Sequence, residues 1–437
     1  MAEKVHIITY GCQMNKADSA DLAGWMEKHG FELHASVDGA DILLVNTCSV
    51  RQGAEDRAIQ MVRSINHNIK GGCPRVIGLC GCVAERKGPA LLKELPGISL
   101  VIGPGHFYRI PELVRDVLDT GRRKCLVGGE GRFGPKTTRP RVQLCEMVKV
   151  VEGCTNYCSY CIVPYVRGPE RSRSIKSILD EVKELVSRGA REVSLLGQNI
   201  MAFQVEQGRR PGEGIVDILD GLSDIPDCWR VRLVTAHPRD IHPWFIRALS
   251  NYPIFCPQFQ MPFQSGSNWV LDRMGRGYTR EDYLEKLSLI RDTFPGAGLY
   301  VDVIVGFPRE TEKDFLETLS MLEESRPDRA FIFKYSPRPG SKAAHWEDTV
   351  PPEEKQRRFL EAERCHGSIA LSSHQSLVGK TRQILCEGRS WKDPSRFTGR
   401  TREGQIVVYP ERSGDEKCLV SVRLESASRV CLYGCAI

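Results

Sequence analysis

Three cysteines at a fixed spacing are the residues in this sequence best suited to chemistry. Cys154, Cys158 and Cys161 lie on one short segment, directly after a strand-like run that ends near Val151. Three thiolates on one loop can bind three irons of a 4Fe-4S cluster and leave the fourth iron open. A structural zinc site is the alternative, but it takes four ligands in paired spacings, and the next Cys or His is Cys228. The spacing therefore favours an iron-sulfur cluster.

Three further cysteines each follow a strand-like run near the N-terminus. They are Cys12, Cys48 and Cys82, and the runs lie within residues 5–79. The carboxyl ends of the strands in an open parallel sheet lie along one edge, and ligands bind in the crevice beyond them. We therefore predict that these cysteines converge on one site, although a single cysteine of this kind is more often a buried small hydrophobic residue.

The elements that must position these cysteines predict an α/β fold. Strand-like runs alternate with helical patterns over residues 1–120, which favours an open parallel sheet. Residues 121–141 are basic and glycine-rich and predict a flexible linker. Six strand-like runs over residues 142–376 predict a partial (β/α)6 barrel. Within it, a capping box at Thr279 to Asp282 predicts the start of a helix, and residues 352–376 predict a charged helix at its end. Short strands and turn signals over residues 377–437 predict a small all-β barrel.

Composition excludes several classes of protein. The chain has 437 residues, of which 41% are hydrophobic and 27% charged, so it can bury several cores and is not a disordered tail. Its apolar runs are shorter than the ~18 residues that a membrane span needs, and a basic-then-apolar signal peptide is lacking. We therefore expect a cytoplasmic protein with no membrane partner. In that compartment, 17 cysteines favour metal, cluster or catalytic roles over disulfides.

The segment 154–161 resembles the CxxxCxxC signature of the radical S-adenosylmethionine (radical SAM) enzymes. The resemblance implies a central radical SAM barrel and a 4Fe-4S cluster whose open iron binds S-adenosylmethionine and supplies the electron that cleaves it to a 5′-deoxyadenosyl radical. It also implies that loops after the barrel strands bind S-adenosylmethionine, although each such segment alone fits an ordinary βα turn. The residues expected to bind it are Gly197, Gln198, Asn199, Gly306 and Pro308.

The whole chain is similar to the methylthiotransferase family. The similar segments include GCQMN at 11–15, NTCSVR at 46–51, GCVAE at 81–85, GCTNYCSYCIVPYVRG at 153–168, TAHPRD at 235–240 and VGFPRET at 305–311. The resemblance implies that Cys12, Cys48 and Cys82 hold a second 4Fe-4S cluster. It further implies the tRNA branch, which converts N6-isopentenyladenosine at position 37 to its 2-methylthio derivative. Two departures from the family pattern are Glu85, where glutamine is usual, and TAHPRD in place of TSHPRD. Cys80 lies two residues before Cys82, so the assignment of Cys82 as the third ligand rests on the GCVAE match rather than on spacing.

A basic C-terminal region fits an RNA substrate. Residues 371–437 hold eleven Lys or Arg against seven Asp or Glu, interleaved with Trp391 and Phe397. Such a pattern combines attraction to phosphates with stacking surfaces for bases, although a solvated basic face is an equally good interpretation of the charge alone. The resemblance to a TRAM module favours binding of the tRNA anticodon loop. The basic residues are Lys380, Arg382, Arg389, Lys392, Arg396, Arg400 and Arg402.

Several alternatives stay open from the sequence. A methylthiotransferase acting on threonylcarbamoyladenosine in tRNA, or on an aspartate of a ribosomal protein, would use the same clusters. A zinc-stabilised RNA-binding protein without catalysis is the alternative of another class. Arg167, His237, Gln264 and Arg338 could contact substrate, but bracing roles fit them equally well. We therefore predict no catalytic residue beyond the cluster and cofactor sites, and we expect a monomer that receives electrons from a reducing electron-transfer protein.

Overall fold

The computed structural model describes residues 2–50, 52–68, 74–129 and 133–437. The chain forms two compact units. Unit 1 comprises Met1–Val142, Glu152–Arg173 and Arg338–Ala344. Unit 2 comprises Gln143–Val151, Ser174–Pro337 and His345–Ile437. The segment that carries Cys154, Cys158 and Cys161 therefore belongs to the same unit as Cys12, Cys48 and Cys82.

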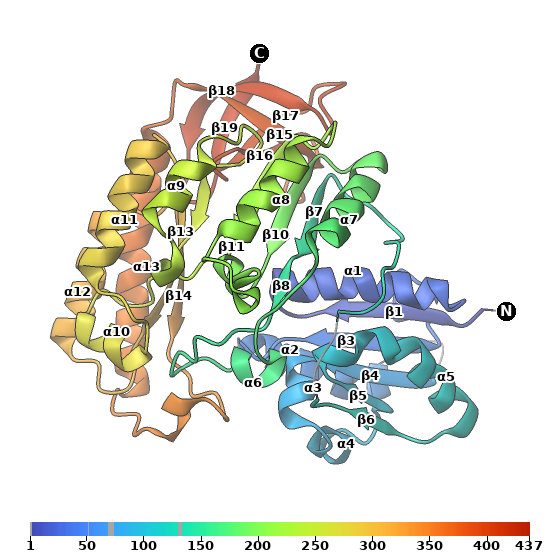
Figure 1. Ribbon diagram of the computed structural model, residues 1–437. Helices are drawn as coiled ribbons and strands as arrows, with labels where there is room; N and C mark the ends of the chain where they lie inside the picture. The colour runs from blue at the N-terminus through green and yellow to red at the C-terminus, as the bar shows by residue number, and fades with distance from the viewer. Residues whose placement is uncertain (1, 51, 69–73, 130–132) are drawn as a thin grey trace. The chain divides into compact units, whose positions relative to one another are not determined.

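Unit 1 is built on an open, entirely parallel sheet with the strand order β2-β1-β3-β4-β5-β6 (Figure 1). Its strands are β1 Lys4–Thr9, β2 Glu32–Leu33, β3 Ile42–Thr47, β4 Val76–Gly81, β5 Leu100–Ile102 and β6 Lys124–Leu126. The three strand-like runs predicted ahead of the N-terminal cysteines are thus confirmed as β1, β3 and β4. All residues of β3 and β4 are buried, as expected for parallel strands that are covered on both faces.

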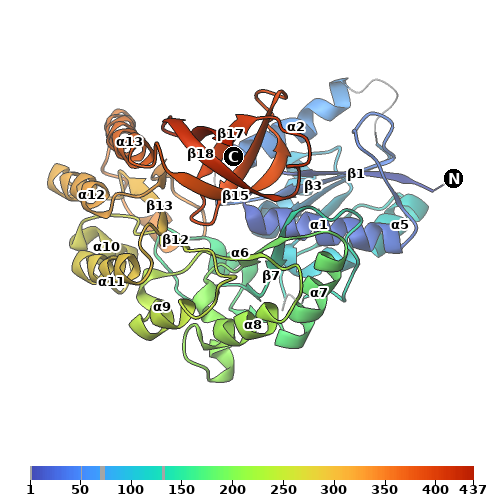
Figure 2. The same ribbon diagram turned by 90° about the horizontal axis from the view of Figure 1, so that it is seen from above.

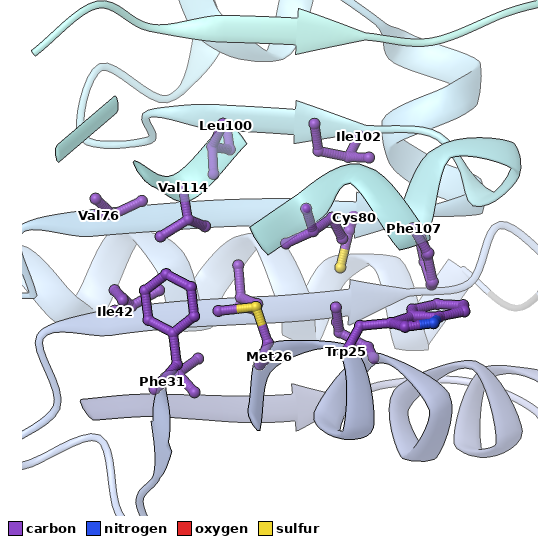
Figure 3. Close-up of a cluster of buried hydrophobic side chains, with 14 of the residues drawn as sticks. Trp25, Met26, Phe31, Ile42, Val76, Cys80, Leu100, Ile102, Phe107 and Val114 are labelled. Carbon is purple, nitrogen blue, oxygen red and sulfur yellow. The ribbon is translucent and has the colours of Figure 1, made fainter. Parts of the chain in front are cut away.

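Helices cover both faces of this sheet. They are α1 Gln13–Lys28, α2 Gln52–Asn68, α3 Cys82–Lys87, α4 Ala90–Glu94, η1 Pro104–Arg109, α5 Ile110–Thr120 and, from the later segment, α6 Val163–Arg167. Successive strand residues point to opposite faces. Ile42 therefore packs with Trp25 and Met26 of α1 (Figure 3), whereas Leu43 packs in a second core against α2 and α4.

The predicted linker, residues 121–141, makes fixed contacts within unit 1 at positions in residues 121–129 and 133–141, in contrast to the flexible connection that we expected. Its residues 124–126 form β6, which pairs with β5. Arg139 is buried and contacts Asp21 at 3.3 Å, and the indole N–H of Trp25 donates to the Pro135 carbonyl at 3.0 Å. These contacts hold the segment against α1, which its glycine content and charge did not predict. Glu130, Gly131 and Arg132 of the linker, and Cys73, lie outside the described residues.

Unit 2 contains the predicted barrel strands, all parallel, in two three-stranded sheets with the orders β11-β10-β7 and β12-β13-β14. The strands are β7 Cys145–Lys149, β10 Glu192–Leu196, β11 Arg230–Val234, β12 Gln258–Gln260, β13 Gly298–Val305 and β14 Arg329–Lys334. A parallel bridge between Val231 and Phe255 links the two sheets. The result is the partial barrel that the sequence predicted. A short pair, β8 Val151–Glu152 and β9 Arg171–Ser172, flanks the CxxxCxxC segment.

Helices alternate with these barrel strands. They are α7 Ile175–Ser187, α8 Glu213–Ser223, α9 Pro243–Leu249, α10 Asn268–Met274, α11 Arg280–Thr293, α12 Glu312–Ser325 and α13 Pro352–Gln375, with short turns η2 Ile200–Ala202, η3 Val205–Gln207, η4 Pro238–Asp240 and η5 Lys342–His345. The capping box predicted at Thr279 and Asp282 is present and begins α11. The charged helix predicted over residues 352–376 is α13.

The C-terminal residues close into a five-stranded barrel with the order β15-β16-β17-β19-β18 (Figure 2). Its strands are β15 Thr381–Arg389, β16 Arg396–Thr401, β17 Ile406–Pro410, β18 Leu419–Ala427 and β19 Leu432–Ala436. Its core contains Phe397, Tyr409 and Leu424, which lie at alternate positions along their strands. The predicted small all-β barrel is therefore confirmed. Within the described part of the chain, no helix is long and apolar enough to cross a membrane.

Candidate functional site

The ends of β1, β3 and β4 bring the N-terminal cysteine set (Cys12, Cys48 and Cys82) together. Cys12 caps α1, Cys48 follows β3 and Cys82 opens α3. The thiols of Cys12 and Cys48 share a hydrogen bond, and Cys82 is near enough for its charge to act on both. Since β1, β3 and β4 are neighbours in the sheet, their carboxyl ends lie side by side as predicted, whereas the use of the three cysteines as one site stays a prediction.

The assignment of the third position to Cys82 rather than Cys80 also has a structural basis. The Cys80 side chain lies in the hydrophobic core beneath the sheet, beside Trp25 and Met26 (Figure 3). Cys82 packs instead against Ile162, next to the end of the CxxxCxxC segment. The Cys80 sulfur therefore lies in the hydrophobic core, whereas the Cys82 sulfur lies on the side of the sheet edge where Cys12 and Cys48 are found.

A buried network of amides holds the first two of these loops together. The Asn15 side-chain NH₂ donates to the Asn46 side-chain oxygen and to the Thr47 carbonyl, both at 3.1 Å. The Asn46 NH₂ in turn donates to the Asn15 carbonyl at 2.9 Å. The Thr47 hydroxyl donates to the Cys80 carbonyl at 2.7 Å, which extends the network to β4. Sequence reasoning missed this network because its members lie in motifs that stood out for their cysteines.

Two glycines allow the loops to approach this closely. Gly81 has φ +97°, and a Cβ there would lie 2.4 Å from the Thr47 carbonyl oxygen. A Cβ on Gly11 would lie 2.3 Å from the Asn15 side-chain oxygen and 2.8 Å from the Cys48 Cβ. Both contacts are with atoms that are themselves fixed, so a larger residue would separate the loops.

The electrostatics of the N-terminal set favour a thiolate at one position. The hydrogen bond from Cys48 lowers the pKa of Cys12 to about 6, and the positive charge of Arg167 acts in the same direction. Burial of the Cys12 thiol acts in the opposite direction, and the hydrogen bond from Cys48 outweighs it. Burial raises the pKa of Cys82, and Arg167 opposes that rise. Thiolates are the form in which cysteine binds metals, so a nearby cation suits this role.

The other set lies on one continuous stretch, the CxxxCxxC loop (residues 154–161). The Cys154 N–H donates to the Gly168 carbonyl at 3.0 Å, and the Cys161 N–H donates to the Cys158 carbonyl at 2.9 Å. The Thr155 N–H donates to the Glu170 carboxylate at 2.8 Å. These local bonds fold the loop back on the residues that follow it. One bond comes from a distant segment, since the Ala343 N–H donates to the Ser159 carbonyl at 2.7 Å. The loop is therefore closed mainly, but not wholly, by residues near it in the sequence.

Two exposed tyrosines mark the surface of this loop. Tyr157 lies between the first two cysteines in a left-handed backbone conformation, with φ +46°, and its ring is 55% exposed. Tyr165 on α6 is 51% exposed, and the two rings meet edge to face with 6.0 Å between their centroids. Large aromatic rings are seldom left exposed as a pair, so this surface can stack on a ligand.

The donor atoms of both sets fit an iron-sulfur cluster, since each offers three thiols and the described cysteines are free of disulfides. Across the described residues, however, no group of three or more His, Cys, Asp or Glu side chains is arranged as a ready-made metal site. The assignment of Cys12, Cys48, Cys82, Cys154, Cys158 and Cys161 as cluster ligands therefore stays a prediction.

In unit 2, the segment Gly197-Gln198-Asn199 follows β10 as predicted. The buried Asn199 side chain accepts from the His237 N–H at 3.0 Å and donates to Asp240 at 2.6 Å. It thereby ties the end of β10 to the segment after β11. A role for these residues in binding S-adenosylmethionine stays a prediction, and the structure adds a bracing role for Asn199.

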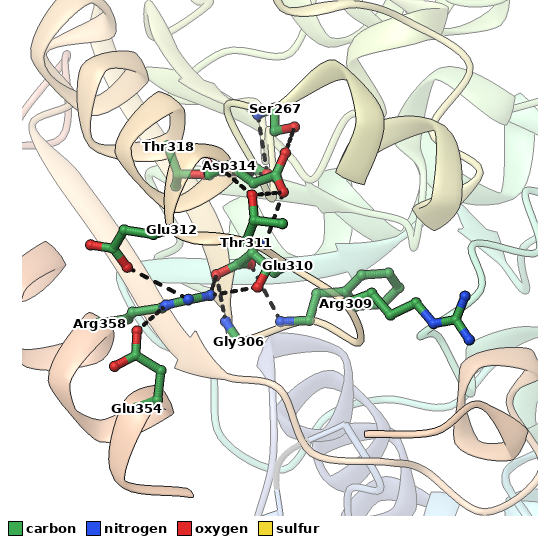
Figure 4. A network of polar contacts seen from close by, with 12 residues as sticks. Ser267, Gly306, Arg309, Glu310, Thr311, Glu312, Asp314, Thr318, Glu354 and Arg358 are labelled. Carbon is green, nitrogen blue, oxygen red and sulfur yellow. Dashed lines mark hydrogen bonds and ion pairs between the residues drawn. The ribbon is translucent and has the colours of Figure 1, made fainter. Parts of the chain in front are cut away.

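The loop after β13 is held by a buried carboxylate (Figure 4). Glu310 accepts from the Gly306 N–H at 2.9 Å and the Phe307 N–H at 3.3 Å, and pairs with Arg358 at 2.8 Å. Burial raises the pKa of Glu310, against the effect of these bonds. Gly306 has φ +71°, and a Cβ there would meet Lys355 at 2.4 Å. The positive φ and the packing against α13 therefore require glycine at this position, whether or not a ligand lies close to it. The binding of S-adenosylmethionine by Gly306 and Pro308 stays a prediction.

The four residues left open by the sequence have bracing contacts. Arg167 pairs with Asp18 at 2.6 Å, and Arg338 donates to Gln52 at 2.6 Å. The Gln264 backbone N–H donates to Asp302 at 2.9 Å.

His237 differs from the other three. Its Nδ1 accepts from the Arg239 N–H, while Nε2 is buried without a hydrogen-bond partner. Burial, with the nearby Arg276, Arg239 and Lys286, lowers the pKa of His237 to about 2, so the ring is neutral at ordinary pH.

Two of the predicted RNA-binding arginines hold the C-terminal barrel to the partial barrel. Arg400 pairs with Glu387 at 2.5 Å, and its carbonyl accepts from Arg230 at 2.7 Å. Arg402 donates to the Phe255 carbonyl at 2.6 Å. Both residues thus have contacts within the chain, and the binding of phosphates by their side chains stays a prediction. Trp391, by contrast, is 86% exposed, and the Lys392 ammonium lies 5.3 Å from the centre of its ring.

Comparisons with known proteins place this chain in a family. Residues 4–103 match the model of the uncharacterized protein family UPF0004, and residues 148–322 match the radical SAM superfamily. The chain is 38% identical to a tRNA-2-methylthio-N(6)-dimethylallyladenosine synthase of Moorella thermoacetica, over 98% of this chain and 97% of that protein. It is also 38% identical to the enzyme of the same name from Porphyromonas gingivalis, over 99% and 94% of the two chains.

Solved structures support the fold. The radical S-adenosylmethionine methyltransferase TsrM from Kitasatospora setae matches with a TM-score of 0.55 and 14% identity, over 79% of this chain and 74% of that one. At this identity the similarity supports the fold alone. The matches to relatives over nearly the whole chain go further: this protein belongs to the family of tRNA-2-methylthio-N(6)-dimethylallyladenosine synthases and, through its central domain, to the radical SAM superfamily.

Proposed function

We propose that this protein converts N6-isopentenyladenosine at position 37 of tRNA to its 2-methylthio derivative. The observation that carries the proposal is the meeting of Cys12, Cys48 and Cys82 at adjacent strand ends, in the same compact unit as the CxxxCxxC loop. Replacing the hydrogen on carbon 2 of an adenine requires both a hydrogen abstractor and a sulfur donor. Two separate sets of three thiols fit these two needs.

In this proposal, Cys154, Cys158 and Cys161 hold a 4Fe-4S cluster, and the family also implies S-adenosylmethionine. Bound together, these cofactors supply the carbon radical that takes the hydrogen from the adenine. The residues of the chain position them: Gly197, Gln198, Asn199, Gly306 and Pro308 are the proposed binding residues for S-adenosylmethionine. Asn199 and Glu310 fix the two loops that carry them.

We assign the second 4Fe-4S cluster to Cys12, Cys48 and Cys82. The positive charge of Arg167 supports this assignment, since it acts to lower the pKa of Cys12 and opposes the rise in the pKa of Cys82 that burial causes, and so favours the thiolate form that binds metals. The glycine-lined approach of the loops keeps the three sulfurs close. The family resemblance gives this set the role of carrying the sulfur that is transferred.

The C-terminal barrel is proposed to grip the tRNA around the anticodon loop. Trp391 and Lys392 offer a stacking face beside a positive charge, which suits single-stranded RNA. We expect Lys392→Gln to weaken tRNA binding and to flatten its logarithmic salt dependence by about 0.7–0.9, the value for one phosphate contact. Arg400→Gln should instead destabilise the protein, because Arg400 pairs with Glu387. An unchanged slope in Lys392→Gln would show that RNA is bound elsewhere.

Nucleoside mass spectrometry tests the reaction. The reconstituted protein is incubated, under reducing conditions with S-adenosylmethionine, with matched tRNAs that carry isopentenyladenosine, threonylcarbamoyladenosine or unmodified adenosine at position 37. We expect a methylthio product only from the first. A product from the second, or from a ribosomal-protein aspartate, would replace the proposed substrate. No product, together with zinc in place of iron, would support the non-catalytic alternative. Electron supply by a reducing protein, a monomeric state and a cytoplasmic location stay predictions.

A further inference from the structure

A buried arginine lies where the two cysteine sets approach each other within unit 1. Arg167 is the last residue of α6, six positions after Cys161, and Asp18 lies on α1, six positions after Cys12. Their side chains are each only 4% exposed and meet at 2.6 Å. Glu152 lies 3.8 Å from the same guanidinium. A buried arginine is costly unless it is paired, so this position is tightly constrained.

The surroundings of Arg167 link it to the sulfur atoms. Cys82 packs against Ile162 and Val166, which are on α6 and its N-terminal cap, so α6 lies directly on the N-terminal cysteine set. The guanidinium is within hydrogen-bonding reach of the Cys82 sulfur, and its charge also acts on Cys12. Arg167 lies on α6, the helix that follows the CxxxCxxC loop, and its positive charge acts on the N-terminal cysteine set.

The charge balance explains why a cation is needed here. Three thiolates with a 4Fe-4S core of charge 2+ carry a net negative charge, and Asp18 and Glu152 add more. Negative charges that are close together in a buried site repel each other strongly. Reduction of a cluster adds another electron, and a neighbouring cation stabilises that reduced form. Hydrogen bonds and local charge are the means by which proteins set such potentials.

We propose that Arg167 is a positioning residue that binds α6 to the N-terminal cysteine set and raises the reduction potential of the cluster held there. The proposal rests on the second cluster proposed above. It predicts that the charge of the side chain at position 167, and not merely its size, controls that potential. A purely structural ion pair would make no such difference.

Simple replacement of Arg167 would leave Asp18 buried and unpaired, which would disturb folding. The test therefore uses two full-length variants, Asp18→Asn/Arg167→Lys and Asp18→Asn/Arg167→Met. In both, a neutral asparagine replaces the carboxylate that pairs with the side chain at position 167. Lysine and methionine are similar in length but differ in charge. Both are made with Cys154, Cys158 and Cys161 replaced by alanine, so that only the N-terminal cluster remains. Its midpoint potential is measured by a redox titration followed by electron paramagnetic resonance.

We expect about four irons per chain in both variants, and a lower potential in the methionine variant. A tenfold change in the one-electron equilibrium corresponds to about 59 mV, and we expect a difference of at least that size. Equal potentials, with iron retained, would overturn the inference and leave the second cluster intact. Absence of iron in the parent chain that lacks only Cys154, Cys158 and Cys161 would instead refute the proposed second cluster. Iron bound by the lysine variant but not by the methionine variant would support the charge requirement.

Discussion

The two cysteine sets reach similar chemistry by different routes. The CxxxCxxC loop is closed mainly by backbone bonds between residues that are near each other in sequence, with one further bond from the distant Ala343. The N-terminal cysteine set is assembled from three strand ends and depends on buried amides and glycines in each loop. A site made from one loop should tolerate damage in distant elements. A site assembled from three loops should be lost whenever any one of them moves.

The largest effect expected from this difference is that of Gly81→Ala. The new Cβ would face the Thr47 carbonyl at 2.4 Å in a left-handed conformation that alanine adopts reluctantly. We expect a loss of about 4 kcal/mol in unfolding free energy, from steric overlap and backbone strain together. The N-terminal set should lose its iron while the CxxxCxxC loop keeps about four irons per chain. Urea unfolding and iron analysis measure both.

Gly30→Ala is the matched control for that variant. Gly30 also has a positive φ, of +84°, but a Cβ there would come no nearer than 3.7 Å to another atom, on Arg115. It should cost only the backbone strain, about 1 kcal/mol, and leave both sets of iron in place. Equal losses in the two variants would mean that the close approach of the loops does not matter.

Asn15→Ala should have the next largest effect. It removes the buried donor from the Asn46 side-chain oxygen and from the Thr47 carbonyl, at an expected cost of about 3 kcal/mol. Asn46→Ala should behave in the same way, and the double variant should cost clearly less than the two single effects combined, since the residues share one network. Strict additivity in denaturant unfolding of the three variants would contradict a shared network.

His237 provides a comparison outside both cysteine sets, because it belongs to unit 2. The pKa of His237 is lowered from 6.5 to about 2 in the folded protein. Below pH 6.5, His237 is therefore protonated in the unfolded chain but stays neutral in the folded chain. Stability should therefore fall with acid, by about 1 kcal/mol between pH 7.5 and 5.5. The apo protein with His237→Gln should lack this part of the loss. Identical pH profiles for the two proteins would show that His237 is accessible to protons.

The smallest effect is expected for Glu170→Gln in the CxxxCxxC loop. Glutamine keeps an acceptor for the Thr155 N–H but loses the charge and the second oxygen, which accepts from the Thr155 hydroxyl. We expect a change of about 0.5 kcal/mol, with iron content unaltered at both sites. Loss of the cluster from this variant would mean that the loop is not as self-contained as its backbone bonds suggest.

The same contrast explains what could be predicted from the sequence. The CxxxCxxC spacing, the strand ends before Cys12, Cys48 and Cys82, and the capping box at Thr279 are all local patterns, and local patterns can be read directly. That the carboxyl ends of these strands lie along one edge followed from rules for parallel sheets, whereas the full strand order did not. The convergence of three distant cysteines followed in turn from those rules.

Contacts between residues far apart in the chain could not be predicted. Asp18 and Arg167 are separated by 149 positions, and nothing near either one indicates the other. The same holds for Gly306, whose missing Cβ makes room for Lys355, and for Arg402, whose guanidinium donates to the Phe255 carbonyl. The numbers of charged residues and glycines in a segment describe its composition. Which residues these side chains contact is determined by the fold.

The division of roles between the two cysteine sets is the central claim, and one measurement tests it directly. Protein with Cys12, Cys48 and Cys82 replaced by alanine is reconstituted, reduced and supplied with S-adenosylmethionine and isopentenylated tRNA. Chromatography with mass spectrometry follows 5′-deoxyadenosine and the modified nucleoside in the same sample. We predict continued formation of 5′-deoxyadenosine, because the CxxxCxxC loop is intact, and no 2-methylthio product. Formation of the 2-methylthio nucleoside by this variant would contradict the account.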